Sequence, residues 1–334
     1  MTPSRLPHNF AAMTPAWIRA GASALTALMA ACNEPAPRDV EVVQARGGLA
    51  DTAASLTLRV LALRDAPVGG LAVLVSDSSG GTARHVLIDG GESDDEVAVA
   101  LRRHGVREVA LVVLTHAHTD HFGGLARVVR ELPVDGFAYN GDSRNLDRYR
   151  RLLSTVERSR ARAIIVSDSV RRVTVVTGSD TLVVTLIPPP PPGAVDRGDP
   201  INNRSVAVHL RYGAFTALVP GDAEHAAQRW WRQRFRSLLD VDVLVASHHG
   251  ANDANSSRRR PDWYNTVTPR ALLVAANGRQ HPHRPVLEHA ARLGIATYCT
   301  SSHGSIAVRV SRGVWTVLTE RPAPCAPGTE SPAP

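Results

Sequence analysis

Short runs of apolar residues recur along the chain, and clusters of polar residues separate them. Leu56 to Leu63 and Leu71 to Val75 have the apolar pattern that predicts strands. Leu111 to Leu114 contains only leucine and valine, which is typical of a buried strand. Further strands are predicted at residues 85–89, in two segments between 171 and 187, on either side of 212–213, from 241, and at 305–310 and 314–318.

Helical spacing of apolar residues marks three segments. Asp94 to His104 is predicted as a helix, and Leu125 to Leu132 as a second one that Pro133 ends. Asp142 to Arg162 is crowded with arginine and predicts an amphipathic helix. Its arginines form either a solvated face or a groove for phosphates, and the sequence leaves both readings open. The apolar positions expected to face inward are Leu146, Leu152, Leu153 and Val156.

Four residues with metal-ligand chemistry follow the strand at 111–114 within six positions. They are His116, His118, Asp120 and His121. A loop at a strand end can aim alternate residues at one ion and hold the Asp-His pair beside a second ion. Imidazole and carboxylate groups are ligands that zinc accepts. A polar loop that happens to be rich in histidine is the alternative, but clusters of this composition are typical of metal sites.

The pattern His-x-His-x-Asp-His after an apolar strand resembles the signature of the metallo-β-lactamase superfamily. The resemblance implies an α/β fold of four layers, an αββα sandwich, with one or two metal ions between its sheets. It also implies that Asp89 braces the metal loop and that Asp222 bridges two ions. One of His248 and His249 would be the last ligand, since neighbouring side chains near a strand end point in opposite directions.

A narrower resemblance concerns the hydrolase domain of the ComEC-type competence proteins, over residues 56–318. It depends on Asn202-Asn203-x-Ser205, Pro220-Gly221-Asp222, Ser247-His248-His249-Gly250 and His281-Pro282-His283. Two features depart from these families. The glycine-rich segment after the first strand is replaced by 63–70, and no histidine lies between His121 and His209, where lactamases carry another ligand. Because an amide is a poor zinc ligand, Asn202 or Asn203 in that place makes manganese an alternative to zinc.

The resemblance implies a site with two divalent metal ions, zinc or manganese, that activate a water molecule. Asp120 would orient this water, and His283 or His281 would give a proton to the leaving group. A hydrogen-bonded or surface role for these two histidines is an equal alternative. The expected metal ligands are His116, His118, Asp120, His121, Asp222 and one of His248 and His249, and the expected substrate contacts are Asn202, Asn203 and Ser205.

The first 31 residues contain no acidic residue and include a short apolar segment, as in a secretory signal peptide. The segment ends in Leu-Met-Ala-Ala-Cys, which resembles a lipobox with Cys32 as the lipidated residue. An ordinary signal peptide or a buried alanine-rich helix is the alternative. We therefore expect a signal peptide at 1–31, a linker at 32–55, the hydrolase domain at 56–320 and a disordered tail at 321–334. The protein would be an exported lipoprotein anchored to a membrane of a bacterial envelope.

Composition and charge change this picture only slightly. The chain has 334 residues, 43% of them hydrophobic, which suffices for a globular core. Its formal net charge of +7 favours an anionic partner, possibly DNA, and no protein partner is inferred. All 38 basic residues are arginine, so an arginine at any one position is weak evidence for bidentate recognition of a ligand. Cys299 and Cys325 could pair in an oxidising compartment, although the prolines around Cys325 argue against it.

These observations predict an exported metal-dependent hydrolase, most simply a phosphodiesterase or nuclease. Three alternatives remain open. The first is hydrolysis of a small ester, lactone, thioester or lactam, and the second is a metal-free binding lipoprotein. The third is a nucleic-acid binder that uses 229–236, Arg-Trp-Trp-Arg-Gln-Arg-Phe-Arg, as a stacking surface. Against the third, Trp231, Phe235 and Leu238 also fit the buried stripe of a helix.

Overall fold

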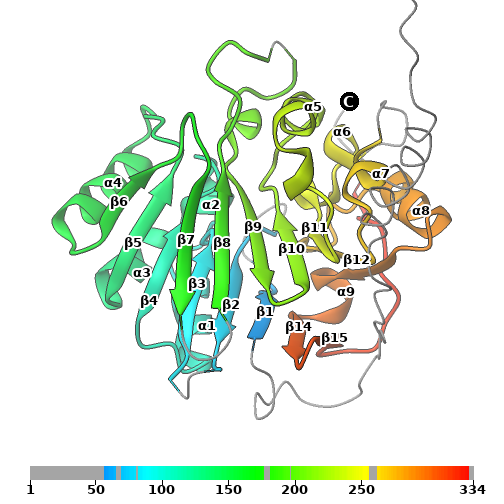
Figure 1. Ribbon diagram of the computed structural model, residues 1–334, viewed down its shortest axis with the longest axis horizontal. Helices are drawn as coiled ribbons and strands as arrows, with labels where there is room; N and C mark the ends of the chain where they lie inside the picture. The colour runs from blue at the N-terminus through cyan, green and yellow to red at the C-terminus, as the bar shows by residue number, and fades with distance from the viewer. Residues whose placement is uncertain are drawn as a thin grey trace, which may run out of the picture. The chain divides into compact units, whose positions relative to one another are not determined.

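The computed structural model describes residues 56–64, 69–79, 82–176, 181–195, 197–255 and 262–330. In this part of the chain two β-sheets pack face to face, and helices cover their outer faces (Figure 1). The predicted signal peptide, Cys32 and the linker lie outside the described residues. The same holds for Arg258, Arg259 and Arg260, a run of arginines near the second histidine motif that could guide a polyanion. No helix among the described residues combines the length and the apolar character that a membrane crossing requires.

The first sheet has eight strands in the order β15-β14-β1-β2-β3-β4-β5-β6. Its β3, β4, β5 and β6 pair in parallel, and its other neighbours pair antiparallel. Their bounds are β1 Leu56–Val60, β2 Val73–Asp77, β3 Arg84–Ile88, β4 Val109–Val113, β5 Val134–Tyr139, β6 Arg162–Ile165, β14 Ile306–Ser311 and β15 Val314–Thr319.

The second sheet has seven strands in the order β13-β12-β11-β10-β9-β8-β7. From β10 to β13 the strands are parallel, and β7 to β10 form antiparallel hairpins. Their bounds are β7 Arg171–Val176, β8 Thr181–Ile187, β9 Ala207–Tyr212, β10 Phe215–Val219, β11 Val243–Val245, β12 Ala271–Val274 and β13 Ala296–Cys299.

Helices lie on the outer face of each sheet. Apolar residues of α1, α3 and α4 pack on the first sheet, and those of α5, α7 and α8 pack on the second. The predicted αββα sandwich is therefore confirmed. The helices are α1 Glu96–Arg103, α2 Thr119–Phe122, α3 Leu125–Glu131, α4 Asp147–Arg158, α5 His225–Arg234, α6 Asn252–Asn255, α7 Trp263–Val267, α8 Arg284–Arg292 and α9 Thr300–His303.

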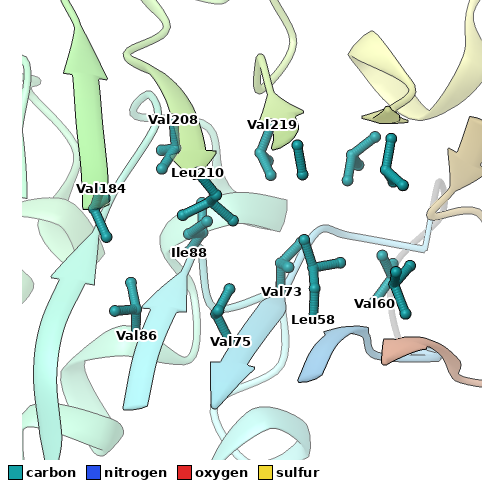
Figure 2. Close-up of a cluster of buried hydrophobic side chains, with 14 of the residues drawn as sticks. Leu58, Val60, Val73, Val75, Val86, Ile88, Val184, Val208, Leu210 and Val219 are labelled. Carbon is teal, nitrogen blue, oxygen red and sulfur yellow. The ribbon is translucent and has the colours of Figure 1, made fainter. Parts of the chain in front are cut away.

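The main core fills the space between the two sheets. Figure 2 shows valine, leucine and isoleucine side chains of the first sheet meeting those of β8, β9 and β10. Alternate residues of a strand face the same side of a sheet, so every second side chain of each sheet points into the space between the two sheets. The strand ends above this core are consequently held in fixed positions. The labelled residues are Leu58, Val60, Val73, Val75, Val86, Ile88, Val184, Val208, Leu210 and Val219.

Helix α4 is shorter than predicted and uses a different inward face. Leu152 and Val156 are buried as expected, but Leu146 is 37% exposed because it precedes the helix in extended backbone. Tyr149 takes the inward position instead, where its hydroxyl donates to the carbonyl of Asp142. The prediction for Leu146 was wrong because the helix begins at Asp147, which shifts the buried stripe.

The segment after β15 also differs from expectation. We expected a disordered tail from Arg321, but residues 321–330 lie against the domain. A disulfide joins Cys325 to Cys299 at the end of β13, contrary to our argument from the prolines. The amide of Gly328 donates to the carbonyl of Pro282, and the amide of Thr329 donates to that of Gly278. Prolines remove amide donors, but the disulfide and the remaining amides suffice to fix the segment.

Candidate metal centre

The residues predicted as ligands come from strand ends at one edge of the sandwich. β4 leads into the loop with His116 and His118, and the parallel strand β3 delivers Asp89 beside it. In the second sheet β10 leads to Asp222, and the parallel strand β11 leads to the histidine pair. Parallel strands present their carboxyl ends at the same edge, so residues far apart in sequence meet there.

Four side chains form the first ligand group: Asp120, His121, Asp222 and His249. The Nε2 atom of His121 lies 3.2 Å from Oδ2 of Asp222, and Nε2 of His249 lies 3.2 Å from Oδ2 of Asp120. Both Nε2 atoms are buried without a hydrogen-bond partner. Two orphaned imidazole nitrogens facing two carboxylates make a donor set that suits a divalent metal ion.

Three side chains form the second ligand group: His116, His118 and Asp222. The Nε2 atom of His116 lies 3.1 Å from Nδ1 of His118 and 3.9 Å from Oδ2 of Asp222. Asp222 thus belongs to both groups. A carboxylate has two oxygens and can contact two ions, whereas a neutral imidazole offers a single ligand atom.

Neighbouring groups orient the ligand imidazoles. Nδ1 of His121 lies 2.8 Å from Oδ2 of Asp89, and Nδ1 of His249 lies 2.8 Å from the carbonyl oxygen of Ala275. An acceptor at Nδ1 fixes the proton there and leaves Nε2 free to bind a metal. Asp89 in turn accepts bonds from the amide and the hydroxyl of Thr115. Asp89 therefore has the bracing position that the resemblance implied.

The structure separates His248 from His249. Nδ1 of His248 lies 3.0 Å from Oδ1 of Asp253, and together with Glu224 these residues form a third cluster beside the ligand groups. His249 alone of the pair enters the first ligand group. Both histidines have positive φ angles, 47° and 53°, a conformation that costs energy for residues other than glycine. Such strain concentrates at functional sites, where it turns neighbouring side chains toward different targets.

The electrostatics of the ligand groups favour binding a cation. Burial lowers the pKa of His116 well below its ordinary value, so this ring is neutral at pH 7 and ready to act as a ligand. Burial also opposes charge on His121, but the carboxylates of Asp222 and Asp120 outweigh it and raise the pKa of this ring. Asp222 is buried, yet His121 and His249 hold the pKa of its carboxyl well below the usual range. The carboxylate remains ionised and can neutralise a divalent ion.

Two of the three expected substrate contacts have other roles in the structure. The fully buried Asn203 accepts a bond from the amide of Ala227 and donates to the carbonyl of Asp199. The hydroxyl of Ser205 is equally buried and accepts a bond from the amide of Asp222. These two side chains hold the ligand loops, because burial leaves them no surface for a substrate. The third, Asn202, donates to Glu224, while its buried Oδ1 has no partner.

The histidine pair at 281–283 lies beside the first ligand group. The ring of His281 stacks on that of His249 with centroids 6.3 Å apart, and burial lowers the pKa of His281 to about 3. His283 is more accessible, and its Nδ1 accepts a hydrogen bond from the amide of Asn252. The neutral ring of His283 therefore carries its proton on Nε2. Of the two, His283 has the tautomer and the access that a hydrogen-bond donor to a bound substrate needs.

Sequence reasoning missed several residues that shape the site. Thr115, Ala275 and Asp253 contact Nδ1 of His116, His249 and His248, respectively. A threonine, a backbone carbonyl and an isolated aspartate carry no signal in sequence. Asp253 lies five residues after His248, so a helical turn after the histidine pair was the one available hint.

Comparison with known proteins agrees with the geometry. A family model, described as the metallo-β-lactamase superfamily, matches residues 66–303, which is more than half of the chain. The chain belongs to the metallo-β-lactamase superfamily. The superfamily typically binds divalent metals, and the two ligand groups supply residues able to hold them. A search of curated proteins gave no match.

Several solved structures are similar to the chain. Tm1679, a metal-dependent hydrolase of the β-lactamase superfamily, is 15% identical with a TM-score of 0.49, over 76% of this chain and 99% of that one. A diphosphatase from the PhnP family is 14% identical with a TM-score of 0.43, over 77% and 98%. CmlA β-hydroxylase is 14% identical with a TM-score of 0.46, over 78% of this chain. The chain spans about half the length of CmlA, since the match covers 55% of it.

Proposed function

We propose that this protein hydrolyses phosphodiester bonds with two divalent metal ions. The observation that carries the proposal is the position of Asp222, whose carboxylate belongs to both ligand groups. The ligand atoms within each group lie within 4.8 Å of one another, and the shared carboxylate brings the groups together. Paired metal sites of this kind are typical of enzymes that cleave phosphate esters.

The residues of the two groups divide between the two ions. His116, His118 and Asp222 would hold one ion, and Asp120, His121, His249 and Asp222 would hold the other. When bound, such ions lower the pKa of a water molecule and act as Lewis acids toward a phosphate oxygen. Zinc and manganese both suit these ligands.

The chain supplies the remaining groups itself. Asp120 is one-fifth exposed while its oxygen faces His249, so the carboxylate can orient the attacking water. Interactions with His121 and His249 hold its pKa below the usual value despite burial, so it stays an acceptor. The Nε2–H of His283 would donate a hydrogen bond to the leaving oxygen and stabilise the charge that develops there. Ser205 keeps the Asp222 loop in place, and Asn202 presents a free carbonyl oxygen.

The positive charge of the chain and the resemblance to ComEC-type hydrolase domains support an anionic, DNA-like substrate. A net charge of +7 attracts polyanions and makes binding depend on salt. The alternative surface at 229–236 is less suited to stacking on bases, because Trp231 is fully buried and donates to the carbonyl of Pro188. The guanidinium of Arg234 already covers Trp230, 4.7 Å from its ring centroid.

Export as a lipoprotein is part of the same proposal. Its support is the Cys32 motif in the sequence together with the disulfide between Cys299 and Cys325, a bond that persists in oxidising compartments. Replacement of Cys32 by alanine would abolish fatty-acid labelling of the protein in bacteria. Labelling that persists in Cys32→Ala would contradict the anchor and leave the hydrolase proposal untouched.

A substrate panel tests the activity. The protein loaded with zinc or manganese is assayed on a single-stranded oligonucleotide, bis(4-nitrophenyl) phosphate, a lactam and a thioester, with Asp222→Asn as the inactive control. We expect cleavage of both phosphodiesters and a kcat/KM for the oligonucleotide that falls steeply as salt increases. Turnover of the lactam or the thioester alone would overturn the proposal.

A further inference from the structure

A cavity lies between the two sheets, at the same edge of the sandwich as the ligand groups. It has a volume of about 460 Å³, and four separate segments line it. They are the connections that follow β1, β12 and β13, together with the segment after β15. Each of the first, second and fourth segments contributes one arginine, and the third contributes a serine. We call this cavity the arginine pocket, after Arg64, Arg279 and Arg321, and it also includes Ser301.

Within the described residues, the three arginines of the arginine pocket lie without a carboxylate partner. No carboxylate among the described residues pairs with the guanidinium of Arg64, Arg279 or Arg321. Arg321 donates instead to the carbonyl oxygens of Ser302 and Ser301, which fixes its position in the wall. The hydroxyl oxygen of Ser301 is buried and has no hydrogen-bond partner. A buried hydroxyl without a partner, beside guanidinium groups that no described carboxylate pairs with, indicates that a polar ligand belongs there.

Two backbone segments link the lining of the arginine pocket to the first ligand group. Ala276 lines the pocket, and the residue before it, Ala275, supplies the carbonyl that orients His249. The second connection is the glycine pair before β2. A Cβ atom on Gly69 would lie 2.5 Å from the amide nitrogen of Asn277, and one on Gly70 would lie 2.9 Å from the carbonyl oxygen of Asp120. The backbone at 69–70 therefore touches the pocket wall on one side and the metal loop on the other.

We propose that the arginine pocket binds a second phosphate group of the substrate whose scissile phosphodiester lies at the metal centre. The chain has no lysine, so the choice of arginine is not informative by itself. The clustering of three arginines that no described carboxylate pairs with supports the site. Guanidinium groups from three directions and one hydroxyl match the oxygens of a tetrahedral anion, whereas one guanidinium fork suffices for a planar carboxylate. The proposal rests on the proposed phosphodiesterase activity and narrows its substrates to those with neighbouring phosphates, as in a nucleic-acid strand.

Direct binding provides the first test. Inorganic phosphate is titrated calorimetrically into the metal-loaded protein and into the double variant Arg279→Gln/Arg321→Gln. The matched control is Arg103→Gln/Arg107→Gln, which removes the same charge at exposed positions at the end of α1 and beyond it, remote from the pocket lining. We expect the pocket variant to lose one binding event, while the control keeps it. Equal phosphate binding by the wild type and the pocket variant would overturn the proposal.

Kinetics provide the second test. Wild type and variants are compared on a dinucleotide with a 5′-phosphate and on bis(4-nitrophenyl) phosphate, which has one phosphate only. The pocket variant should lose about 10-fold in kcat/KM on the dinucleotide, the effect of removing a charge-assisted hydrogen bond. It should stay within about twofold on the single diester. Ser301→Ala, a smaller change, should lower the first rate in the same direction.

The outcomes separate the two proposals. An equal loss on both substrates would mean that the arginines support the metal loop, and it would overturn the second phosphate site. If neither diester is cleaved, the proposed phosphodiesterase function fails, while the calorimetric comparison still decides whether the arginine pocket binds phosphate.

Discussion

The Nδ1 atom of His121 lies 2.8 Å from Oδ2 of Asp89, and both side chains are completely buried. Asp89 directly follows β3, and His121 lies in α2 after the loop that follows β4. The parallel pairing of β3 and β4 places the ends of these two strands side by side. This bond fixes the imidazole of a candidate metal ligand at Nδ1 and leaves its Nε2 free for a metal ion. Asp89 also has a φ of 58°, which turns its carboxylate back toward the loop at Thr115.

Replacement of Asp89 by asparagine should weaken metal binding about 10- to 100-fold, because the bracing carboxylate of His121 is lost. Asparagine tolerates positive φ, so the backbone conformation is kept. Competition with a fluorescent chelator measures the affinity. The control is Asp242→Asn, the same change at a buried aspartate that accepts bonds from Thr216. Asp242→Asn should lower stability and leave metal affinity unchanged, and an equal loss of affinity in both variants would contradict the bracing role.

Asp222→Asn should reduce the bound metal and lower kcat/KM by about 100-fold or more, because one carboxylate serves both ligand groups. Elemental analysis after loading measures the stoichiometry, and circular dichroism confirms that the fold is retained. A variant with full metal content and an unchanged rate would remove Asp222 from both roles.

His248 and His249 provide a matched pair of neighbours. His249→Ala should lower metal affinity strongly, since its orphaned Nε2 faces Asp120 and Asp222. His248→Ala should keep the metal, since Asp253 holds His248 in the third cluster. Aspartates 222 and 253 outweigh burial and raise the pKa of His248 to about 9, so this ring is charged at neutral pH in the metal-free protein. Metal titrations of the two variants show which histidine is the ligand. A greater loss of affinity in His248→Ala than in His249→Ala would refute the assignment of His249.

His209 on β9 should make the stability of the protein depend on pH. Burial and Arg211 lower its pKa from 6.5 to about 4, so below pH 6.5 the unfolded chain binds a proton that the folded chain does not. The free energy of unfolding should therefore fall as the pH drops from 6.5 to 4, by roughly 3 kcal/mol from this residue. Urea unfolding of metal-free wild type and His209→Gln at pH 7 and pH 4.5 measures it. The same pH dependence in both proteins would show that His209 contributes nothing.

Much of the sandwich could be predicted because its strands are short apolar runs that end in polar clusters. β4 and the ligand loop after it form the strongest such signal. The strands β5 and β6 went unpredicted, and so did β12 and β13, whose four residues each show no alternation of apolar and polar positions. The importance of β12 and β13 appears only in three dimensions, where the connections after them line the arginine pocket and the carbonyl of Ala275 orients His249.

The sequence predicts candidate ligands from residue type alone, as with the histidines and aspartates of the ligand groups. It does not predict the direction in which a side chain points. Sequence could not choose between His248 and His249, because the choice depends on two successive positive φ angles. Nor could it show that Asn203 and Ser205 are buried. Their burial depends on hydrogen bonds to the amides of Ala227 and Asp222, which lie far from them in the sequence.

The bond between Cys299 and Cys325 has a consequence for where the protein can work. Arg321 lies in the stretch of chain that this bond closes, whereas every ligand of the two metal groups lies outside that stretch. Thiol reduction would release the wall of the arginine pocket and leave the ligand strands paired. Under the two proposals above, reduction of this disulfide would therefore weaken the binding of a longer substrate and leave the candidate metal ligands in place.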